Sequence, residues 1–189
     1  MFFFKRGRGP FALHESMVGV RMGDRFLQVG VGDGRLFATL AAKVGLTGRA
    51  CALDADASRA AKARQVAVTA GVLVDVECSP FDRLPFDANA FDVVLMYRVI
   101  STVSPEIRVR CLQQTRELLR PGGRCMVIDV TPRGGLGGLF GRSARDTSYV
   151  TTGGAERALR EEGFAAVRRL ADRDGEAFFE GVRKSEPAA

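Results

Sequence analysis

The fold of this chain is decided by the stretch Phe26-Leu27-Gln28-Val29-Gly30-Val31-Gly32-Asp33-Gly34-Arg35-Leu36. It begins as a short apolar strand, places glycine at every second position of a turn, and continues into the apolar spacing of a helix. Glycines between a strand and a helix let the backbone approach a ligand, and the helix N-terminus adds free N–H groups. A plain tight turn needs a single glycine, so three glycines favour a binding turn.

The spacing of these glycines distinguishes two kinds of nucleotide site. Dinucleotide-binding folds carry G-x-G-x-x-G, in which the third glycine permits close packing of the helix on the strand. Here Gly30, Gly32 and Gly34 form G-x-G-x-G, and Arg35 takes the place of that third glycine. A side chain as large as Arg argues against a pyrophosphate lying on this turn.

Strand and helix patterns alternate along the chain after this turn. In chain order the sequence predicts a helix at 36–44, a strand at 50–54, a helix at 57–70, strands at 72–77 and 91–97, a helix at 105–119, a turn at 121–123 and a strand at 124–130. This βαβα order predicts a parallel sheet with helices on both faces.

Asp54 is the second candidate functional residue. It closes a predicted buried strand about 20 residues after the glycine turn, where nucleotide-binding folds place the acid that accepts hydrogen bonds from ribose hydroxyls. The alternative role is an N-cap, since Asp is common before helices. Asp56 or Ser58 can serve as that cap equally well, so the sequence favours the ribose role for Asp54.

Five pieces of sequence occur in an order typical of one enzyme family. They are the glycine turn, Leu53-Asp54, Leu84-Pro85-Phe86, Phe91-Asp92-Val93-Val94 and Leu119-Arg120-Pro121-Gly122-Gly123. With these motifs, residues 25–183 resemble the class I, Rossmann-like methyltransferases that depend on S-adenosylmethionine. Within that family the chain looks most similar to the branch that methylates small molecules, including enzymes of quinone biosynthesis.

The resemblance implies a single α/β domain of Rossmann-like fold. Its mostly parallel sheet has seven strands in the order 3-2-1-4-5-7-6, with the seventh antiparallel and helices on both faces. Residues 152–163 would form the last helix, and 165–170 and 177–182 the last two strands, around a turn at 172–175. The implied cofactor is S-adenosylmethionine, and the residues expected to bind it are Gln28, Gly30, Gly32, Gly34, Asp54, Ala55, Ser79, Phe81 and Tyr97.

Two positions depart from the family pattern. The family usually carries an acid two residues before the first glycine, near the amino-acid end of the cofactor, where this chain has Gln28. An amide forms hydrogen bonds but supplies no charge to an ammonium group. The family also often has an acid four residues before the Leu of Leu-Pro-Phe, and this chain has Pro80 there.

Methyl transfer requires few catalytic groups from the protein. Transfer from a sulfonium is a displacement, so holding the nucleophile in line supplies much of the rate, and a base is needed only if the nucleophile must lose a proton. The catalytic candidates are Tyr97, at the end of a strand, and His14, the only histidine in the chain. Packing at a strand end and a solvated position on a helix are the structural alternatives for these two residues.

Composition sets the remaining limits. A length of 189 residues fits one domain, and a formal charge of +6 is compatible with an anionic substrate, an acidic membrane surface or a general bias toward Arg. Four cysteines without paired spacing predict no metal site and a reduced, cytoplasmic setting. Three of these cysteines fall in apolar patterns that predict burial. No apolar run is long enough for a transmembrane segment.

The sequence also suggests boundaries. Residues 1–24 are expected to form an N-terminal segment, irregular at first and then helical from about Leu13 to Val20. Residues 25–184 would form the methyltransferase domain, and residues 185–189 would form a tail. The glycine-rich stretch from Gly134 to Gly141 predicts a mobile loop after the fifth strand. It is expected to act either as a lid over an apolar acceptor or as an ordinary connector.

Three functional classes stay open at this point. The first is methyl transfer to a small, apolar or lipid-like acceptor, with peripheral membrane contact as an accompanying option. The second is an RNA or protein methyltransferase, which the positive charge favours and the lack of Asn/Asp-Pro-Pro-Tyr after residues 91–97 disfavours in part. The third is a binding protein that keeps the fold without catalysis, a hypothesis that rests on Gln28 and Pro80.

Overall fold

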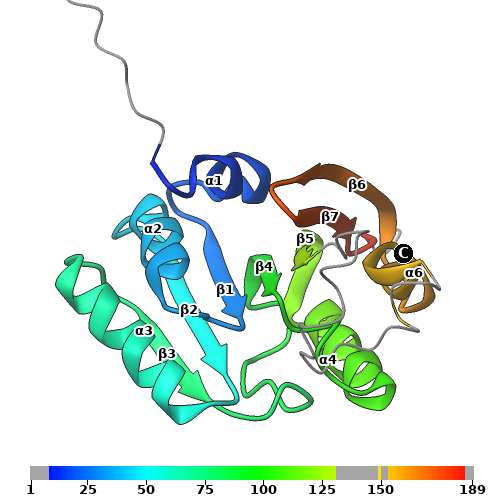
Figure 1. Cartoon of the computed structure of the whole chain (residues 1–189), viewed down its shortest axis with the longest axis horizontal. Helices are drawn as coiled ribbons and strands as arrows, with labels where there is room; N and C mark the ends of the chain where they lie inside the picture. Colours follow the sequence, from blue (N-terminus) through cyan, green and yellow to red (C-terminus); the bar gives the residue numbers. More distant parts are fainter. Residues whose placement is uncertain (1–8, 131–148, 150–152, 186–189) are drawn as a thin grey trace, which may run out of the picture.

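The computed structural model describes residues 9–130, 149 and 153–185, and the chain forms one seven-stranded sheet. The strand order is β3-β2-β1-β4-β5-β7-β6, which confirms the predicted order (Figure 1). Strands β1 to β5 are parallel, and β7 runs antiparallel between β5 and β6. Every parallel strand therefore ends at the same edge of the sheet, and the polar residues that follow these strands gather there.

The elements alternate along the chain as predicted. The strands are β1 (Arg25–Val29), β2 (Arg49–Asp54), β3 (Asp75–Cys78), β4 (Phe91–Tyr97), β5 (Leu119–Val130), β6 (Ala165–Arg173) and β7 (Glu176–Val182). The helices are α1 (Ala12–Val18), α2 (Arg35–Val44), α3 (Ala57–Thr69), α4 (Pro105–Leu118) and α6 (Gly154–Glu161).

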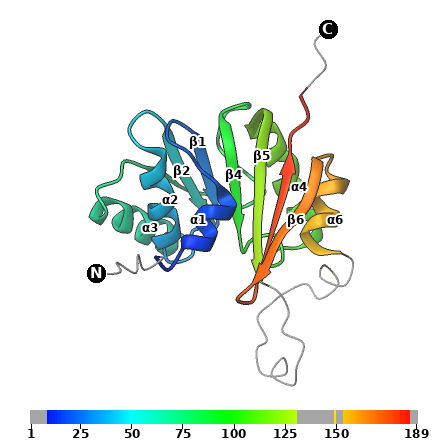
Figure 2. The ribbon, with the colours of Figure 1, turned by 90° about the horizontal axis from the view of Figure 1, so that it is seen from above.

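Alternation along the strands divides the core into two layers, because successive side chains of a strand point to opposite faces of a sheet. On one face Phe26 and Leu95 pack with α1, α2 and α3. On the other face Leu27 and Val94 pack with α4 and α6. Figure 2 shows the two groups of helices on either side of the sheet. Both faces of the central strands are buried, as expected for a parallel sheet.

Three predicted elements have different limits in the structure. Strand β6 continues to Arg173, so it includes the first half of the turn expected at 172–175. Strand β3 begins at Asp75 rather than residue 72, because β2 pairs with it only from Cys51 onward and Leu73 is 80% exposed. The predicted turn at 121–123 is part of β5, where the register shifts so that Phe91 pairs with Leu119 but Val93 pairs with Arg124. The proline and glycines therefore form a bulge within one strand rather than a turn before it.

The local sequence indicates where several elements end. The helix expected from about Leu13 to Val20 is α1, which ends at Gly19 in the left-handed conformation. Strands β6 and β7 are joined at Asp174 and Gly175, which both have positive φ, as a two-residue hairpin turn requires. The predicted burial of three cysteines is confirmed, and Cys78 is exposed.

Candidate cofactor-binding site

A cavity of about 620 Å³ opens at the carboxyl ends of β1, β2 and β4. This volume lies within the roughly 300–1,000 Å³ that small-molecule sites occupy. The residues that line it are Phe11, Gly30, Gly32, Asp33, Arg35, Leu36, Asp54, Arg59, Phe81, Tyr97, Arg98, Val99 and Thr102. Parallel α/β sheets bind their ligands at this edge, so the cavity is the first candidate for a functional site.

The glycine turn fits this edge of the sheet closely. A β-carbon at Gly30 would lie 2.5 Å from the carbonyl oxygen of Tyr97, and one at Gly32 would lie 3.3 Å from the Tyr97 ring. Gly34 faces away from the cavity toward α3, where a β-carbon would lie 2.7 Å from Cα of Ala63. Gly30 thus lets the turn pack directly against the end of β4, Gly32 lies against the Tyr97 ring, and Gly34 allows α2 to pack against α3.

Asp54 lines the cavity and is almost fully buried. Its Oδ2 accepts a hydrogen bond from the Val31 amide at 3.0 Å, so it braces the glycine turn. Its Oδ1 accepts from the Asp56 amide and, at 3.0 and 2.8 Å, from two nitrogens of Arg59. Asp56, whose side chain accepts from the Arg59 amide, is the N-cap of α3. The capping role that competed with ribose binding at Asp54 therefore belongs to Asp56.

Gln28 lies under the turn rather than in the cavity wall. Its side chain is fully buried, and Nε2 donates a hydrogen bond to the Gly30 carbonyl oxygen at 3.0 Å. Its amide oxygen has no hydrogen-bond partner among the described residues. A carboxylate at this position would lose the donor that now holds Gly30, so the amide suits the turn as this chain builds it.

Tyr97 and His14, the two catalytic candidates, lie side by side. Their ring centroids are 6.3 Å apart, and Tyr97 lines the cavity whereas His14 lies behind it. Burial raises the pKa of Tyr97, and neighbouring Arg98 acts in the opposite direction. His14 is not a solvated helix residue, because its Nε2 lies 2.8 Å from the Glu176 carboxylate and its side chain is 14% exposed.

Glu176, at the start of β7, contacts both His14 and the residue after Tyr97. It accepts hydrogen bonds from Nε and Nη2 of Arg98 at 2.8 and 2.6 Å as well as from His14. Burial by itself raises the pKa of Glu176, but the bonds from His14 and Arg98 outweigh it, so the pKa is lowered. Arg98 has a φ of +55°, a left-handed conformation that directs the chain out of β4 toward the cavity.

The other predicted cofactor residues separate into two groups. Phe81 lines the cavity. Ala55 is exposed beyond the end of β2, and the Ser79 hydroxyl donates to the Arg83 carbonyl within its own loop. Pro80 is exposed. The Gly134–Gly141 stretch, predicted to be a lid or a connector, lies outside the described residues.

Sequence reasoning missed several residues at this site, and three of them carry the argument below. Arg59, Phe11 and Glu176 come from α3, from the residue before α1 and from β7. Arg59 lies five positions after Asp54, so its place on the first turn of the following helix was available as a local signal. Glu176 is 78 residues from Arg98, and no local pattern connects them.

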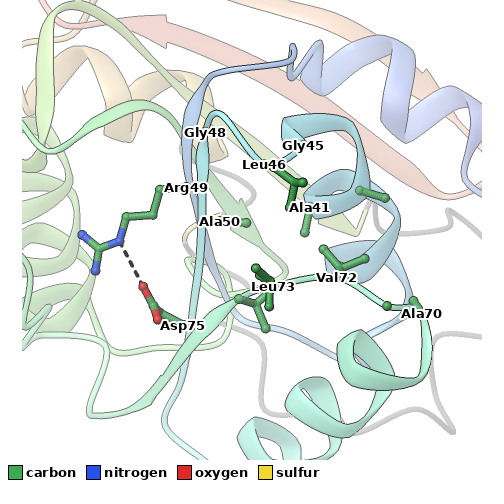
Figure 3. A pocket seen from close by; sticks show the side chains of 13 residues that line it. Ala41, Gly45, Leu46, Gly48, Arg49, Ala50, Ala70, Val72, Leu73 and Asp75 are labelled. Carbon is green, nitrogen blue, oxygen red and sulfur yellow. Dashed lines mark hydrogen bonds and ion pairs between the residues drawn. The ribbon is translucent and has the colours of Figure 1, made fainter.

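A second cavity, of about 530 Å³, lies at the opposite end of the strands between the C-terminal ends of α2 and α3 (Figure 3). Its wall is mainly Ala, Gly, Leu and Val, with an Arg49–Asp75 ion pair at 3.0 Å on its rim. It holds no cluster of reactive side chains, so it does not compete with the first cavity as a catalytic site. Within the described part of the chain, no helix has the length and apolar character to cross a membrane.

Comparison with known sequences places the chain in a family. The profile described as the methyltransferase domain matches residues 26–123, just over half of the 189 residues. The ubiquinone/menaquinone biosynthesis C-methyltransferase UbiE of Chromobacterium violaceum is 30% identical over 111 residues, which cover 59% of this chain and 45% of UbiE. UbiE of Teredinibacter turnerae is 33% identical over 113 residues, with coverage of 59% and 45%. The chain thus spans a little under half the length of these relatives.

Solved structures agree at the level of the fold. A SAM-dependent methyltransferase from Aquifex aeolicus superposes with a TM-score of 0.75 at 20% identity, covering 93% of this chain and 89% of the other. The [4+2]-cyclase SpnF gives a TM-score of 0.70 at 18% identity, with coverage of 92% and 79%. The five motifs, the strand order and the matched profile agree, and the chain belongs to the methyltransferase-domain family, as a class I, Rossmann-like member of the S-adenosylmethionine-dependent methyltransferases.

Proposed function

We propose that this chain binds S-adenosylmethionine in the 620 Å³ cavity and transfers its methyl group to a carbon of a small, apolar, quinone-related acceptor. The observation that carries the proposal is the meeting of the glycine turn, Asp54 and Tyr97 around one cavity at the carboxyl edge of the sheet. The UbiE relatives, which are named for C-methylation in quinone biosynthesis, support the acceptor class.

The residues present fit this cofactor. Gly30 and Gly32 line the cavity with bare backbone, and Asp54 lies in the cavity wall as the candidate acceptor for ribose hydroxyls. Phe81 offers a flat apolar surface to the adenine ring. Gln28 and Gly34 would contribute indirectly. Gln28 holds the turn through its bond to Gly30, and Gly34 allows the turn to pack against α3.

When bound, the cofactor supplies a methyl group on a sulfonium, open to displacement by a nucleophile. The chain contributes position. The ring carbon that accepts the methyl group loses a proton, and this proton can pass to solvent water, so the described residues need not supply a dedicated base. Phe11, Leu36 and Val99 give the cavity an apolar wall, and the Tyr97 hydroxyl is available to orient an acceptor oxygen. His14 stays within 6.3 Å of the Tyr97 ring, where it fixes the ring rather than touching an acceptor.

The charge of the cavity favours a small acceptor over nucleic acid. Three arginines line it, and each is paired with a carboxylate: Arg35 with Asp33, Arg59 with Asp54, and Arg98 with Glu176. Contacts with phosphates require cations that are free to replace counterions. The cavity therefore offers little net positive charge to an RNA backbone, despite the overall charge of +6.

Two measurements test the proposal. Calorimetric titration with S-adenosylhomocysteine should give binding with a 1:1 stoichiometry. Incubation with methyl-labelled S-adenosylmethionine and a reduced naphthoquinol or benzoquinol carrying a short isoprenoid chain should put label on a ring carbon. Label that enters total RNA or protein instead would overturn the acceptor class. Binding without transfer to any of these acceptors would favour a non-catalytic protein.

A variant outside the described residues separates the acceptor classes further. Replacing Leu136, Leu139 and Phe140 together by Ser should reduce transfer to the quinol and leave the affinity for S-adenosylhomocysteine unchanged. The matched control replaces Arg133 and Arg142 by Gln and should leave quinol methylation unchanged. If the acceptor were RNA, the control would be the damaging change, and the loss would deepen with added salt.

A further inference from the structure

The carboxylate expected to hold the cofactor ribose already has a partner of the opposite charge. Arg59 places Nε at 3.0 Å and Nη2 at 2.8 Å from Oδ1 of Asp54, a two-nitrogen contact within the site itself. The Asp54 side chain is only 2% exposed, whereas that of Arg59 is 49% exposed. Both residues line the cavity, so the ion pair is part of the cavity wall.

The hydrogen bonds of Asp54 are divided unevenly between its two oxygens. Oδ1 accepts three, from the Asp56 amide and from two nitrogens of Arg59, whereas Oδ2 accepts one, from the Val31 amide. Each carboxylate oxygen has about two lone-pair positions, so Oδ1 is fully used and one position on Oδ2 stays open. A ribose diol donates two hydrogen bonds, and the two backbone amides are fixed by the turn and by the start of α3. The guanidinium of Arg59 is therefore the only one of these partners that can leave without unfolding an element.

The position of Arg59 makes such a departure easy. Its backbone amide is bound by the Asp56 cap at 2.9 Å, so the Cα stays in place while the long side chain moves. Nη1 lies 3.7 Å from the Asp56 carboxylate, which is 44% exposed and offers the guanidinium a second partner at the rim. A half-exposed guanidinium also regains water when it moves.

We propose that Arg59 competes with the cofactor ribose for Asp54, so that it must leave Asp54 on binding and thereby lowers the affinity of the site for cofactor. In the ligand-free protein Arg59 neutralises a buried carboxylate, and in the complex the ribose hydroxyls take its place. This inference rests on the proposed function, because it takes Asp54 as the ribose acceptor. Arg59 would then be a residue that lowers the cofactor affinity of the site, in contrast to the residues that provide this affinity.

The test measures the affinity for S-adenosylhomocysteine by calorimetry in Arg59→Ala and Arg59→Gln. We expect Arg59→Ala to tighten binding by about threefold to tenfold, the range for exchanging hydrogen bonds at a half-exposed charged group. Arg59→Gln keeps one donor and should fall between Arg59→Ala and the parent. Without ligand, both variants should melt at a lower temperature than the parent, because Asp54 loses its cation. The variants would thus bind the ligand more tightly while being less stable without it. A purely structural role of Arg59 would not produce this combination.

The matched control is Arg49→Ala. Arg49 begins the strand that Asp54 ends, and it pairs with Asp75 at 3.0 Å on the rim of the second cavity (Figure 3). The variant removes the same charge from the far end of β2 and should leave the affinity unchanged. A second control places Arg59→Ala in an Asp54→Asn background, where the gain in affinity should disappear, because Arg59 acts through the Asp54 charge.

The outcomes separate this inference from the proposed function. Tighter binding in Arg59→Ala that depends on Asp54 supports the inference. Equal or weaker binding in both variants overturns it and leaves the proposed function standing, with Arg59 as an ordinary contact. No binding by the parent and by both variants overturns the proposed function and this inference together. No binding by the parent but binding by Arg59→Ala supports the inference in its strongest form.

Discussion

Gln28 is the residue at which this chain departs most directly from the sequence pattern of its family. Its amide donates to the Gly30 carbonyl oxygen at 3.0 Å from a fully buried position. A carboxylate of the same shape would turn an acceptor toward that carbonyl and would lose its hydration. The amide therefore serves the turn through a donor that the family's acid does not have.

This argument predicts the effect of Gln28→Glu. We expect the free energy of unfolding at pH 8 to fall by about 1–3 kcal/mol, the cost of a buried polar group that loses its partner. The loss should shrink at pH 5, since burial raises the pKa of a carboxyl and the protonated form donates again. Urea denaturation at the two pH values measures this difference. Equal stability of variant and parent at pH 8 would contradict the role of the Nε2 donor.

At the residue scale the sequence predicted residues that line one cavity but not their contacts. Gly30 and Gly32 follow β1, Asp54 and Tyr97 end β2 and β4, and the common edge of the parallel strands brings the four together. Where a side chain such as that of Arg59 points depends on rotamers and on neighbours from other elements. No periodic pattern encodes that choice, so the ion pair with Asp54 was beyond sequence reasoning.

At the scale of elements, β7 anchors α1 to the sheet. Glu176 accepts a hydrogen bond from His14 of α1 at 2.8 Å and two from Arg98 at the end of β4. Phe11, just before α1, is part of the cavity wall. One buried carboxylate thus connects the helix beside the cavity with the strand that carries Tyr97.

The lowered pKa of Glu176 gives this anchor a pH dependence of known sign. A carboxyl with a lower pKa in the folded state stabilises the fold above its unfolded pKa, near 4.5, and loses that contribution as the pH falls. Glu176→Gln should therefore cost about 1–2 kcal/mol at pH 7 and progressively less below pH 4.5.

Urea denaturation of parent and Glu176→Gln at pH 7, 5 and 3.5 tests this sign. The matched control is Glu161→Gln. Glu161 pairs with Arg157, and both side chains are 56% exposed. This substitution should change the free energy of unfolding by no more than about 0.5 kcal/mol. A cost for Glu176→Gln that stays constant over the three pH values would contradict a contribution from the charge.

Elements were predictable where a local signal marks their ends. Gly19, Asp56 and the Asp174-Gly175 pair each fix a boundary through their own backbone or side-chain geometry. The start of β3 and the bulge in β5 depend instead on which partner strand lies alongside. Pairing between distant segments sets these limits, so they appear only in the folded chain.

For the whole molecule, the sequence suggested a boundary after residue 24, and the folded chain crosses it. Val18 is fully buried and Val20 is 7% exposed, both within the layer formed by α1, α2 and α3. Arg124 of β5 donates to the carbonyl oxygens of Val18 and Gly19 at 3.0 and 3.3 Å. We therefore propose that α1 is part of the domain that residues 25–184 form.

Two deletions test this proposal. Removal of residues 1–20 exposes apolar surface beside Phe26 and leaves Arg124 and Glu176 without partners from α1. We expect it to cost about 3 kcal/mol or more, the range for combined loss of core packing and buried polar partners. Affinity for S-adenosylhomocysteine should fall as well, because Phe11 leaves the cavity wall. Removal of residues 1–8 breaks none of these contacts and is the matched control.

The urea midpoint and the slope of unfolding report on this prediction together. If α1 belongs to the cooperative domain, the longer deletion lowers both, since less surface is buried in the folded state and less is exposed on unfolding. If α1 is an appendage, the midpoint and the affinity for S-adenosylhomocysteine stay at the values of the shorter deletion. In that case the boundary after residue 24 stands, and the bond between His14 and Glu176 is a surface contact without energetic weight.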